Sequence, residues 1–413
     1  MAVSVFQVRT RTEIAAACRR ILESFADVLP AQMGARILLK PNLNSHMNAL
    51  TGNTTDLRVL AGMLGALRER GYANLAVGEG TNSGFYRNEI SVIDRLKVRE
   101  LASAFEARVI DLNHTEGIEI AYENGARPKV SREVLDADLL VNLPKLKTHF
   151  EAGLTACLKN LMGTLVGQTH KKMTHQSLAA NILNLNEAVR PRLHVLDAVI
   201  AMEGLGPTRG TPRNLGLLLA GGDPFVLDLV AARVAGYAPD EVGPLALARR
   251  RGRIGDAEIA AAGAVDVPVA DPPFERPNPS ALARFIHSPK RQPFFFKVRA
   301  MPPFPYLAGT RLGAFLLYQS GLRQDVFVKE DALVESLRFD PGKCRNELAC
   351  EAYCPLPLSL PADVGKAEKG CISCLYCAQV CPSGAISWEG TKGFLAEQER
   401  QYGDIIPAVA RRQ

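Results

Sequence analysis

Seven of the nine cysteines in this 413-residue chain lie between Cys344 and Cys381. The N-terminus has no basic segment followed by an apolar one, so the sequence predicts no secretory signal and a cytoplasmic protein. Thiols in a reducing compartment rarely form disulfides. The cysteine-rich segment is therefore predicted to bind metal, and this requirement restricts its fold more than any other feature of the sequence.

The second half of this segment follows the ligand spacing of bacterial ferredoxins. It reads Cys371-x2-Cys374-x2-Cys377-x3-Cys381-Pro382. Three thiolates on one tight loop can bind three corners of a 4Fe–4S cubane, while the fourth, followed by proline, reaches a different cluster. A zinc knuckle is the alternative interpretation, although zinc sites seldom use this four-cysteine spacing.

The first half of the segment repeats the same spacing with one ligand changed. The residues 3, 6 and 10 positions after Cys344 are Glu347, Cys350 and Cys354, and Pro355 follows. We therefore predict a two-cluster module in which each copy gives its last cysteine to the cluster of the other copy.

This exchange assigns two ligand sets. Cluster one, predicted to be 4Fe–4S, has four thiolate ligands, from Cys354, Cys371, Cys374 and Cys377. Cluster two has three thiolates and one carboxylate, from Cys344, Cys350, Cys381 and Glu347. A carboxylate binds iron of a sulfide cluster more weakly than a thiolate does. Cluster two is thus predicted to be either 4Fe–4S with a non-thiolate fourth ligand or 3Fe–4S. Alternatively, Glu347 is a surface residue and the second site is vestigial.

Residues 1–270 read as strands that alternate with amphipathic helices. The expected strands are Val3–Val8, Arg36–Leu39, Asn74–Val77, Ala107–Leu112, Asp138–Leu143, Leu193–Val199 and Leu215–Leu219. The clearest helical patterns are Thr12–Phe25, Leu57–Leu67 and Phe225–Ala235. Strands that are apolar on both faces favour an α/β fold with a mostly parallel, doubly wound sheet. A small ferredoxin-like α+β iron–sulfur domain follows it.

Composition divides the chain into four parts. We expect an α/β domain at 1–270, a linker rich in proline, aromatic and basic residues at 271–340, an iron–sulfur domain at 341–390 and a C-terminal tail at 391–413. The linker is expected to pack on the first domain. Alternatively, its rings and basic residues at 285–327 contact a membrane surface or a partner protein. No apolar stretch is long enough to predict a membrane span.

A basic stretch at 142–175 is the best candidate for a binding site in the α/β domain. It holds five lysines and three of the seven histidines, with Glu151 as its only acid. In open α/β sheets ligands bind in loops beyond the carboxyl ends of the strands, and this charge balance suits a carboxylate or phosphate. We expect residues 144–149 to form one such loop and Lys159 to lie on a helix of about three turns. The candidates for anion binding and proton donation are Lys145, Lys147, His149 and Lys159, with Asn42 and Glu203 positioning the substrate. Alternatively, the lysines of this stretch are solvated surface residues that form no binding site.

Three motifs resemble signatures of the domain-of-unknown-function 362 family. They are LLKPN at 38–42, NLPKLKTH at 142–149 and LKNLMG at 158–163. Glu203 stands where that family carries an aspartate. The resemblance covers about residues 1–260, and it implies that a C-terminal two-cluster ferredoxin segment is common among members. It implies no established activity.

These features predict an iron–sulfur redox protein, with an oxidoreductase favoured. Its clusters would pass single electrons to or from a small anionic substrate at the α/β domain. The alternative is a non-catalytic electron-transfer or cofactor-delivery protein that docks a redox partner. Nucleic acid is not expected as a partner, because a net charge of +6 is mild for this length. Motifs for nicotinamide or ATP are absent.

Overall fold

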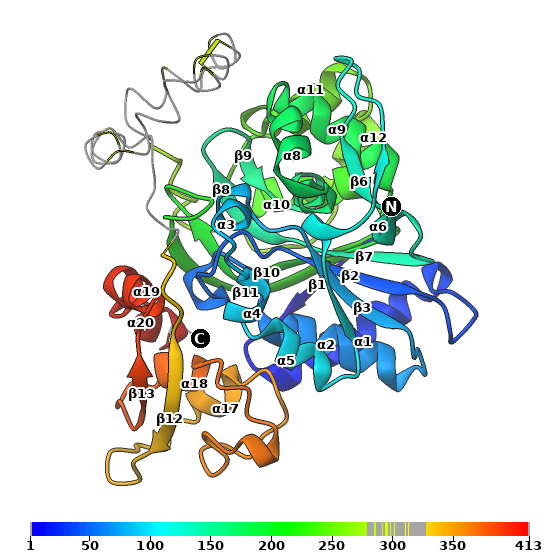
Figure 1. Ribbon diagram of the computed structural model, residues 1–413. Coiled ribbons are helices and arrows are strands. Elements are labelled where there is room, and N and C mark those ends of the chain that lie inside the picture. The colour runs from blue at the N-terminus through cyan, green and yellow to red at the C-terminus, as the bar shows by residue number, and fades with distance from the viewer. Residues whose placement is uncertain are drawn as a thin grey trace.

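The computed structural model describes residues 2–278 and 328–411, with a few isolated positions between these ranges (Figure 1). Most of the aromatic and basic segment 285–327 lies outside the described residues. Its predicted role in docking or membrane contact therefore stays a prediction. None of the helices in the described ranges combines the length and apolar character that a membrane crossing requires.

A sheet of nine strands organises the first 221 residues. Its main path has the order β1-β11-β10-β7-β2-β3-β4. These strands are β1 (Val3–Gln7), β2 (Ile37–Pro41), β3 (Leu75–Glu79), β4 (Arg108–Asp111), β7 (Leu139–Leu143), β10 (Leu193–Glu203) and β11 (Thr211–Gly221). The pairs from β10 to β4 are parallel, whereas β11 is antiparallel to both β10 and β1. The predicted mostly parallel α/β class is confirmed, with an antiparallel edge that was not predicted.

Helices cover both faces of the sheet, as the two-sided apolar strands require. Ile37 and Leu39 of β2 join one hydrophobic cluster, while Leu38 between them joins another on the opposite face. The first face is covered by α1 (Arg11–Ser24), α2 (Leu57–Glu69), α4 (Val92–Arg95) and α5 (Val98–Ser103). The other is covered by α7 (Cys157–Asn160), α9 (Leu178–Val189), α10 (Pro224–Val234), α11 (Gly243–Arg250) and α12 (Asp256–Gly263).

The remaining elements of this domain are short. They are α3 (Ser83–Arg87), α6 (Arg132–Leu135), α8 (Gly167–His175), the antiparallel pair β5 (Gly117–Glu119) and β6 (Lys129–Ser131), and β9 (Gly153–Thr155).

Local signals place the helix ends. Thr10 and Glu13 form a capping box at α1, and the Asp56 carboxylate accepts from the backbone of α2 as its N-cap.

Residues Lys145–His149, which we expected to form a loop, form strand β8 instead. The long strand β10 pairs with β7 near its start and, further along, with β8 in parallel. Pro144 separates the two short strands, and β8 then turns back through β9. The three-turn helix expected around Lys159 is also wrong. Helix α7 has four residues and continues as a 3-10 turn, η4 (Leu161–Thr164).

The C-terminal module is a small two-stranded sheet with short helices. Strand β12 (Leu333–Phe339) pairs antiparallel with β13 (Ile386–Thr391). Its helices are α17 (Ala349–Tyr353), α18 (Tyr376–Val380), α19 (Leu395–Tyr402) and α20 (Ile405–Arg411). Strand β12 begins inside the range predicted as linker, and α19 and α20 occupy most of the range predicted as tail.

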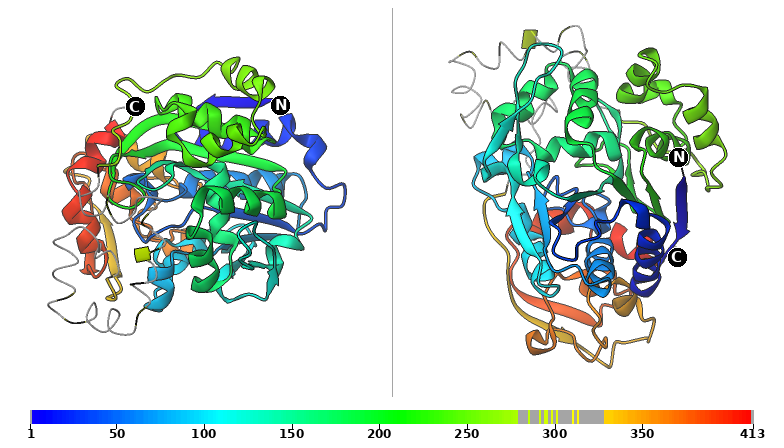
Figure 2. Two further views of the ribbon diagram at one scale, coloured as in Figure 1. Left: turned by 90° about the horizontal axis from the view of Figure 1, so that it is seen from above. Right: turned by 90° about the vertical axis from the view of Figure 1, so that its right-hand side faces the viewer.

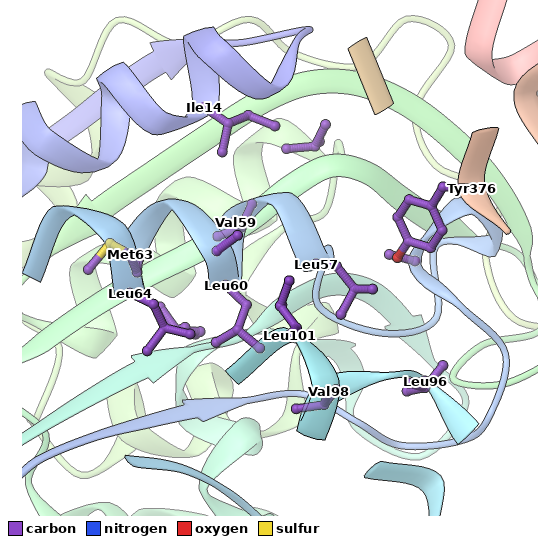
Figure 3. Close-up of a cluster of buried hydrophobic side chains, with 14 of the residues drawn as sticks. Ile14, Leu57, Val59, Leu60, Met63, Leu64, Leu96, Val98, Leu101 and Tyr376 are labelled. Atoms are coloured by element: carbon purple, nitrogen blue, oxygen red, sulfur yellow. The ribbon is translucent and has the colours of Figure 1, made fainter. Parts of the chain in front are cut away.

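The module shares a hydrophobic core with the face of the sheet that α1 and α2 cover. Tyr376 of α18 lies beside Leu57 of α2, in the same cluster as Ile14 and Val59 (Figure 3). Figure 2 (right) places the orange and red module on the side of the blue helices α1 and α2, with the green helices of the other face farthest from it. Burial of this shared apolar surface fixes the module against the sheet.

Candidate functional site

Two cavities in the C-terminal module are lined by two different sets of predicted ligands. The residues that line the first include Cys354, Cys371, Cys374 and Cys377. The residues that line the second include Cys344, Cys350, Cys381 and Glu347. We call these the cluster-one and cluster-two cavities. Each takes one cysteine from the other copy of the motif, as the predicted exchange requires.

The two copies also share an unusual backbone. Ser373 and Leu375 have φ angles of 52° and 64°, and Asn346 and Leu348 at the equivalent positions have 57° and 55°. A left-handed backbone is unfavourable for residues with a side chain and tends to persist where it serves a ligand clamp. The copy that carries Glu347 therefore retains the same clamp conformation as the four-cysteine copy.

Burial affects the thiols of cluster one. It raises the pKa of Cys377 to about 12 and raises those of Cys354 and Cys374 as well. Near neutral pH these thiols lose their protons only when a metal cation binds the sulfur in place of the proton. Binding of an iron–sulfur core must therefore release protons. Among the residues that the structure describes, no three His, Cys, Asp or Glu side chains are close enough to share one metal ion. Thiols spread around a cavity fit a polynuclear core better than a zinc knuckle.

Four of the six predicted site residues, Asn42, Lys145, Lys147 and His149, are buried on β8 or just after β2. Lys159 on α7 and Glu203 at the end of β10 are partly exposed. Lys147 Nζ donates to Asn42 Oδ1 at 2.9 Å and to the Asn53 carbonyl at 2.6 Å. Asn42 in turn donates to Asn160 Oδ1 at 2.8 Å, next to Lys159. We call Asn42, Lys147, His149 and Lys159 the strand-end cluster. Lys147 has no carboxylate partner among the described residues, and burial, together with the charges of Lys159 and Lys145, holds its pKa well below its usual range.

Burial, together with the charge of Lys159, holds the pKa of His149 well below its usual range. Its Nδ1 accepts from the backbone N–H groups of Glu151 and Ala152, at 3.1 and 3.2 Å. This fixes a neutral imidazole with the proton on Nε2. Burial also lowers the pKa of Lys159, to about 8. Lys159, unlike His149, can therefore supply a proton near neutral pH.

Two other predicted site residues are engaged by partners within the protein. Lys145 Nζ lies 2.9 Å from Asp197 Oδ2 in a fully buried ion pair. Glu203 pairs with Arg213 at 2.9 Å and accepts from the Glu275 backbone N–H. Asp197 thus neutralises the charge of Lys145, although Lys145 lies on the same strand as Lys147. Glu203 has its partner, Arg213, on the antiparallel strand β11.

Sequence analysis missed two buried groups that support the strand ends. Lys40 Nζ bonds both carboxylate oxygens of Glu79 at 3.0 Å, although neither residue was chosen as a site residue. Lys171 donates to the carbonyls of Gly80 and Thr81 and to Asn113 Oδ1. A lysine at the end of an apolar strand, followed by a glutamate at the end of the next, is the signal that could have revealed the first pair.

A loop at residues 42–56, which we call the bridging loop, connects the strand-end cluster to the cysteine module. Its first residue bonds Lys147, as described above. In its middle, Asn48 donates from its side chain to Gln379 at 2.7 Å and from its backbone to Gln398 at 3.0 Å. Gln379 lies between the cysteines Cys377 and Cys381. One continuous segment therefore contacts both regions.

Comparisons with known proteins agree with the two-part architecture. A profile described as a domain of unknown function, DUF362, matches residues 37–233, and a 4Fe–4S binding domain profile matches residues 368–387. A thylakoid-associated protein of Synechocystis is 31% identical over 234 residues, which cover 53% of this chain and 68% of that protein. The chain belongs to the DUF362 family. The predicted resemblance is therefore confirmed, and with it a C-terminal 4Fe–4S binding domain.

Two solved structures match part of this DUF362 chain. One is the lactate racemase apoprotein of Thermoanaerobacterium thermosaccharolyticum, with 12% identity and a TM-score of 0.37. The other is a Thermotoga maritima protein, with 12% identity and a TM-score of 0.29. The matches cover 53% and 49% of this chain and 53% of each solved chain, so they span about half of each protein.

Proposed function

We propose that this protein is an iron–sulfur oxidoreductase that passes single electrons between two clusters and a small anionic substrate at the strand-end cluster. The observation that carries the proposal is the bridging loop, which bonds Lys147 at one point and the cysteine-bearing segment at another. When bound, an iron–sulfur cluster supplies or accepts one electron at a time. The residues of this chain then bind the substrate, hold its orientation and move the proton.

The chemistry of the strand-end cluster suits an anion that gains electrons. Lys147 lacks a carboxylate partner among the described residues, so an anionic ligand would complete its surroundings. Asn42 accepts from Lys147 and donates to Asn160, which fixes where the ammonium group points. Lys159, with its pKa of about 8, supplies the proton that balances the added charge. His149, which carries its proton on Nε2, would donate a hydrogen bond from that atom to the bound anion.

Binding of a small anion is expected to depend on Lys147 and Lys159. Replacing either lysine by methionine should weaken phosphate or acetate binding by about 10- to 100-fold, because a charged hydrogen bond contributes about 1.5–3 kcal/mol. Lys172→Met is the matched control, since Lys172 is exposed in the same basic stretch. Isothermal titration calorimetry measures all three. Equal losses in the control and the two variants would contradict a specific site.

The same binding should weaken as pH rises through about 8. Burial depresses the pKa of Lys159, so this lysine loses its charge in that range. A bound anion favours the charged form of Lys159. Above pH 8 this lysine must take up a proton when the anion binds, whereas below pH 8 it already carries one. Lys159→Met should flatten the dependence. Lys171 titrates in the same range, but its three N–H groups already meet three oxygens.

We further propose that cluster two is real and that Glu347 stands at its fourth corner. The repeated left-handed backbone supports this assignment, since a vestigial copy would have no need of it. Glu347→Cys should complete the thiolate set and give iron and sulfide contents of two full cubanes. Any 3Fe–4S electron paramagnetic resonance signal of the oxidised wild type should then disappear. Anaerobic preparation with iron and sulfide analysis measures both.

Glu351→Cys is the matched control for this experiment, because it adds an exposed thiol nearby at a position that the ligand spacing does not use. It should leave the iron content and the spectrum unchanged. A wild-type protein with the iron of a single cubane, and no gain in Glu347→Cys, would show that the second site is empty.

A second candidate function is electron transfer to or from a protein partner without substrate chemistry. One observation favours it: Leu348 lines the cluster-two cavity and has 48% of its surface exposed. A redox partner could approach cluster two there. Recovery of a stoichiometric redox partner from cell extract, with no anion binding at Lys147, would favour this candidate over the first.

A further inference from the structure

A buried arginine lies at the junction between the sheet domain and the cluster-one ligands. Arg58, on the first turn of α2, is 1% exposed. Its Nη1 donates to the Ala352 carbonyl at 3.2 Å, and its guanidinium carbon lies 4.1 Å from the centre of the Tyr353 ring. These two residues directly precede Cys354. A full positive charge thus touches the segment that brings this thiolate to cluster one.

Asp56 is the ionic partner of Arg58. Asp56 bonds the guanidinium through both carboxylate oxygens, at 2.8 Å for the Nη2–Oδ2 pair, and neither side chain is exposed. The Asp56 backbone N–H donates to Asp197, which also holds Lys145. The guanidinium therefore lies against Ala352 and Tyr353 of the module, while the backbone of Asp56 is bonded to the sheet.

The second ligand segment of cluster one also approaches this pair. Tyr376 lies between Cys374 and Cys377 and is buried beside Leu57 (Figure 3). In the sequence, Leu57 stands between Asp56 and Arg58. Its phenol interacts electrostatically with Asp56 and Arg58. Tyr353, directly before Cys354, and Tyr376, directly before Cys377, therefore both lie near the Asp56–Arg58 pair. Charge in such a dry region is weakly screened.

We propose that the Asp56–Arg58 pair sets the reduction potential of cluster one. Reduction adds one electron, drawn from a one-electron donor, to a core that already carries four thiolates. A fixed positive charge stabilises the reduced form, and charge near a cluster is one of the properties that set its potential. Arg58 is a positioning residue here, because it acts through the Ala352–Cys354 segment and its field. The inference rests on cluster one alone and is independent of any substrate.

The two members of the pair should shift the potential in opposite directions. Arg58→Gln removes the positive charge and leaves Asp56, so cluster one should become harder to reduce. Asp56→Asn leaves Arg58 charged and keeps a good helix N-cap, so cluster one should become easier to reduce. We expect at least a tenfold change in the reduced-to-oxidised ratio at fixed poise, which is about 59 mV for one electron.

A dithionite titration with mediator dyes, followed by electron paramagnetic resonance on the full anaerobic chain, measures these shifts. Arg95→Gln is the matched control. Arg95 is also buried at the module interface, but it bonds the Val328 and Lys329 carbonyls and Asp331. It should leave the potential unchanged. Shifts of the same sign in both variants, or no shift, would overturn the proposal.

The double variant Asp56→Asn/Arg58→Gln keeps the test decisive if Arg58→Gln alone fails to assemble. It carries no unpaired charge, and its potential should lie below that of Asp56→Asn. An equal potential in these two proteins would show that the charge of Arg58 has no influence on cluster one. Because no substrate takes part, this outcome leaves the strand-end proposal untouched.

Discussion

Replacing Asp197 by asparagine is expected to lower the free energy of unfolding by about 3–5 kcal/mol. Asp197 lies inside β10 and is fully buried. Its carboxylate accepts from Lys145 Nζ, from the Asp56 backbone N–H at 2.7 Å and from the Val199 backbone N–H at 3.0 Å. The neutral amide leaves Lys145 as an unpaired buried cation. Urea denaturation of the anaerobic protein measures the loss.

The surface pair Glu116–Arg132 provides the control for this prediction. Its side chains are 67% and 45% exposed, so Glu116→Gln should leave the free energy of unfolding almost unchanged. Adding Lys145→Met to Asp197→Asn should recover part of the loss, because the double variant buries no lone charge. The loss should also shrink as pH rises, because an unpaired buried lysine gives up its proton readily. A loss as small as that of Glu116→Gln would contradict a structural role for the pair.

The arrangement of the cysteines could be predicted because their chemistry is local. A thiolate spacing fixes which sulfurs can reach one core, whatever the rest of the chain does. Cys354 lines one cavity with Cys371, Cys374 and Cys377, and Cys381 lines the other with Cys344 and Cys350. That each copy gives its last cysteine to the cluster of the other copy stays a prediction. The sheet class was also predictable, since strands apolar on both faces need helices on both sides.

Strand direction and strand β8 were not predictable from the same patterns. β11 is buried on both faces over its second half, as the parallel strands are, so periodicity cannot distinguish its direction. In β8, Lys145, Lys147 and His149 alternate with Leu146 and Thr148, which is the period of a strand. Lysine is rarely fully buried, so the composition favoured a loop.

A single residue in β10 held the information needed to correct this error. Asp197 is the only acidic residue in the run Leu193–Val199, where His194 is the only other polar residue. A carboxylate in the middle of a buried strand requires a buried cation. The paired strand at that position had to supply one, and Lys145 does. Buried polar residues thus carry the long-range information that apolar periodicity lacks, and the same reasoning applies to Lys40 and Glu79 at the neighbouring strand ends.

Replacing Gly163 by alanine is expected to be comparably damaging, at about 3–5 kcal/mol. Gly163 lies in the 3-10 turn η4, and its backbone covers the Lys40–Glu79 ion pair. A methyl group there would overlap Glu79 Oε1 and lie 2.7 Å from Lys40 Nζ. The carboxylate would have to leave Lys40 and the backbone N–H groups of Leu43 and Gly80 that it also accepts from. The reference for this variant is Gly263→Ala.

Gly263 ends helix α12, and a methyl group there meets no atom within 4 Å. Alanine should therefore be neutral or stabilise by up to about 1 kcal/mol, because glycine is a poor helix former. The two alanine variants change the unfolded chain equally, so their difference isolates the overlap at the strand ends. Anion binding adds a second readout, since displacing Glu79 next to the strand-end cluster should also weaken binding at Lys147. If Gly163→Ala matched Gly263→Ala in stability and binding, the close approach of η4 to the Lys40–Glu79 pair would be refuted.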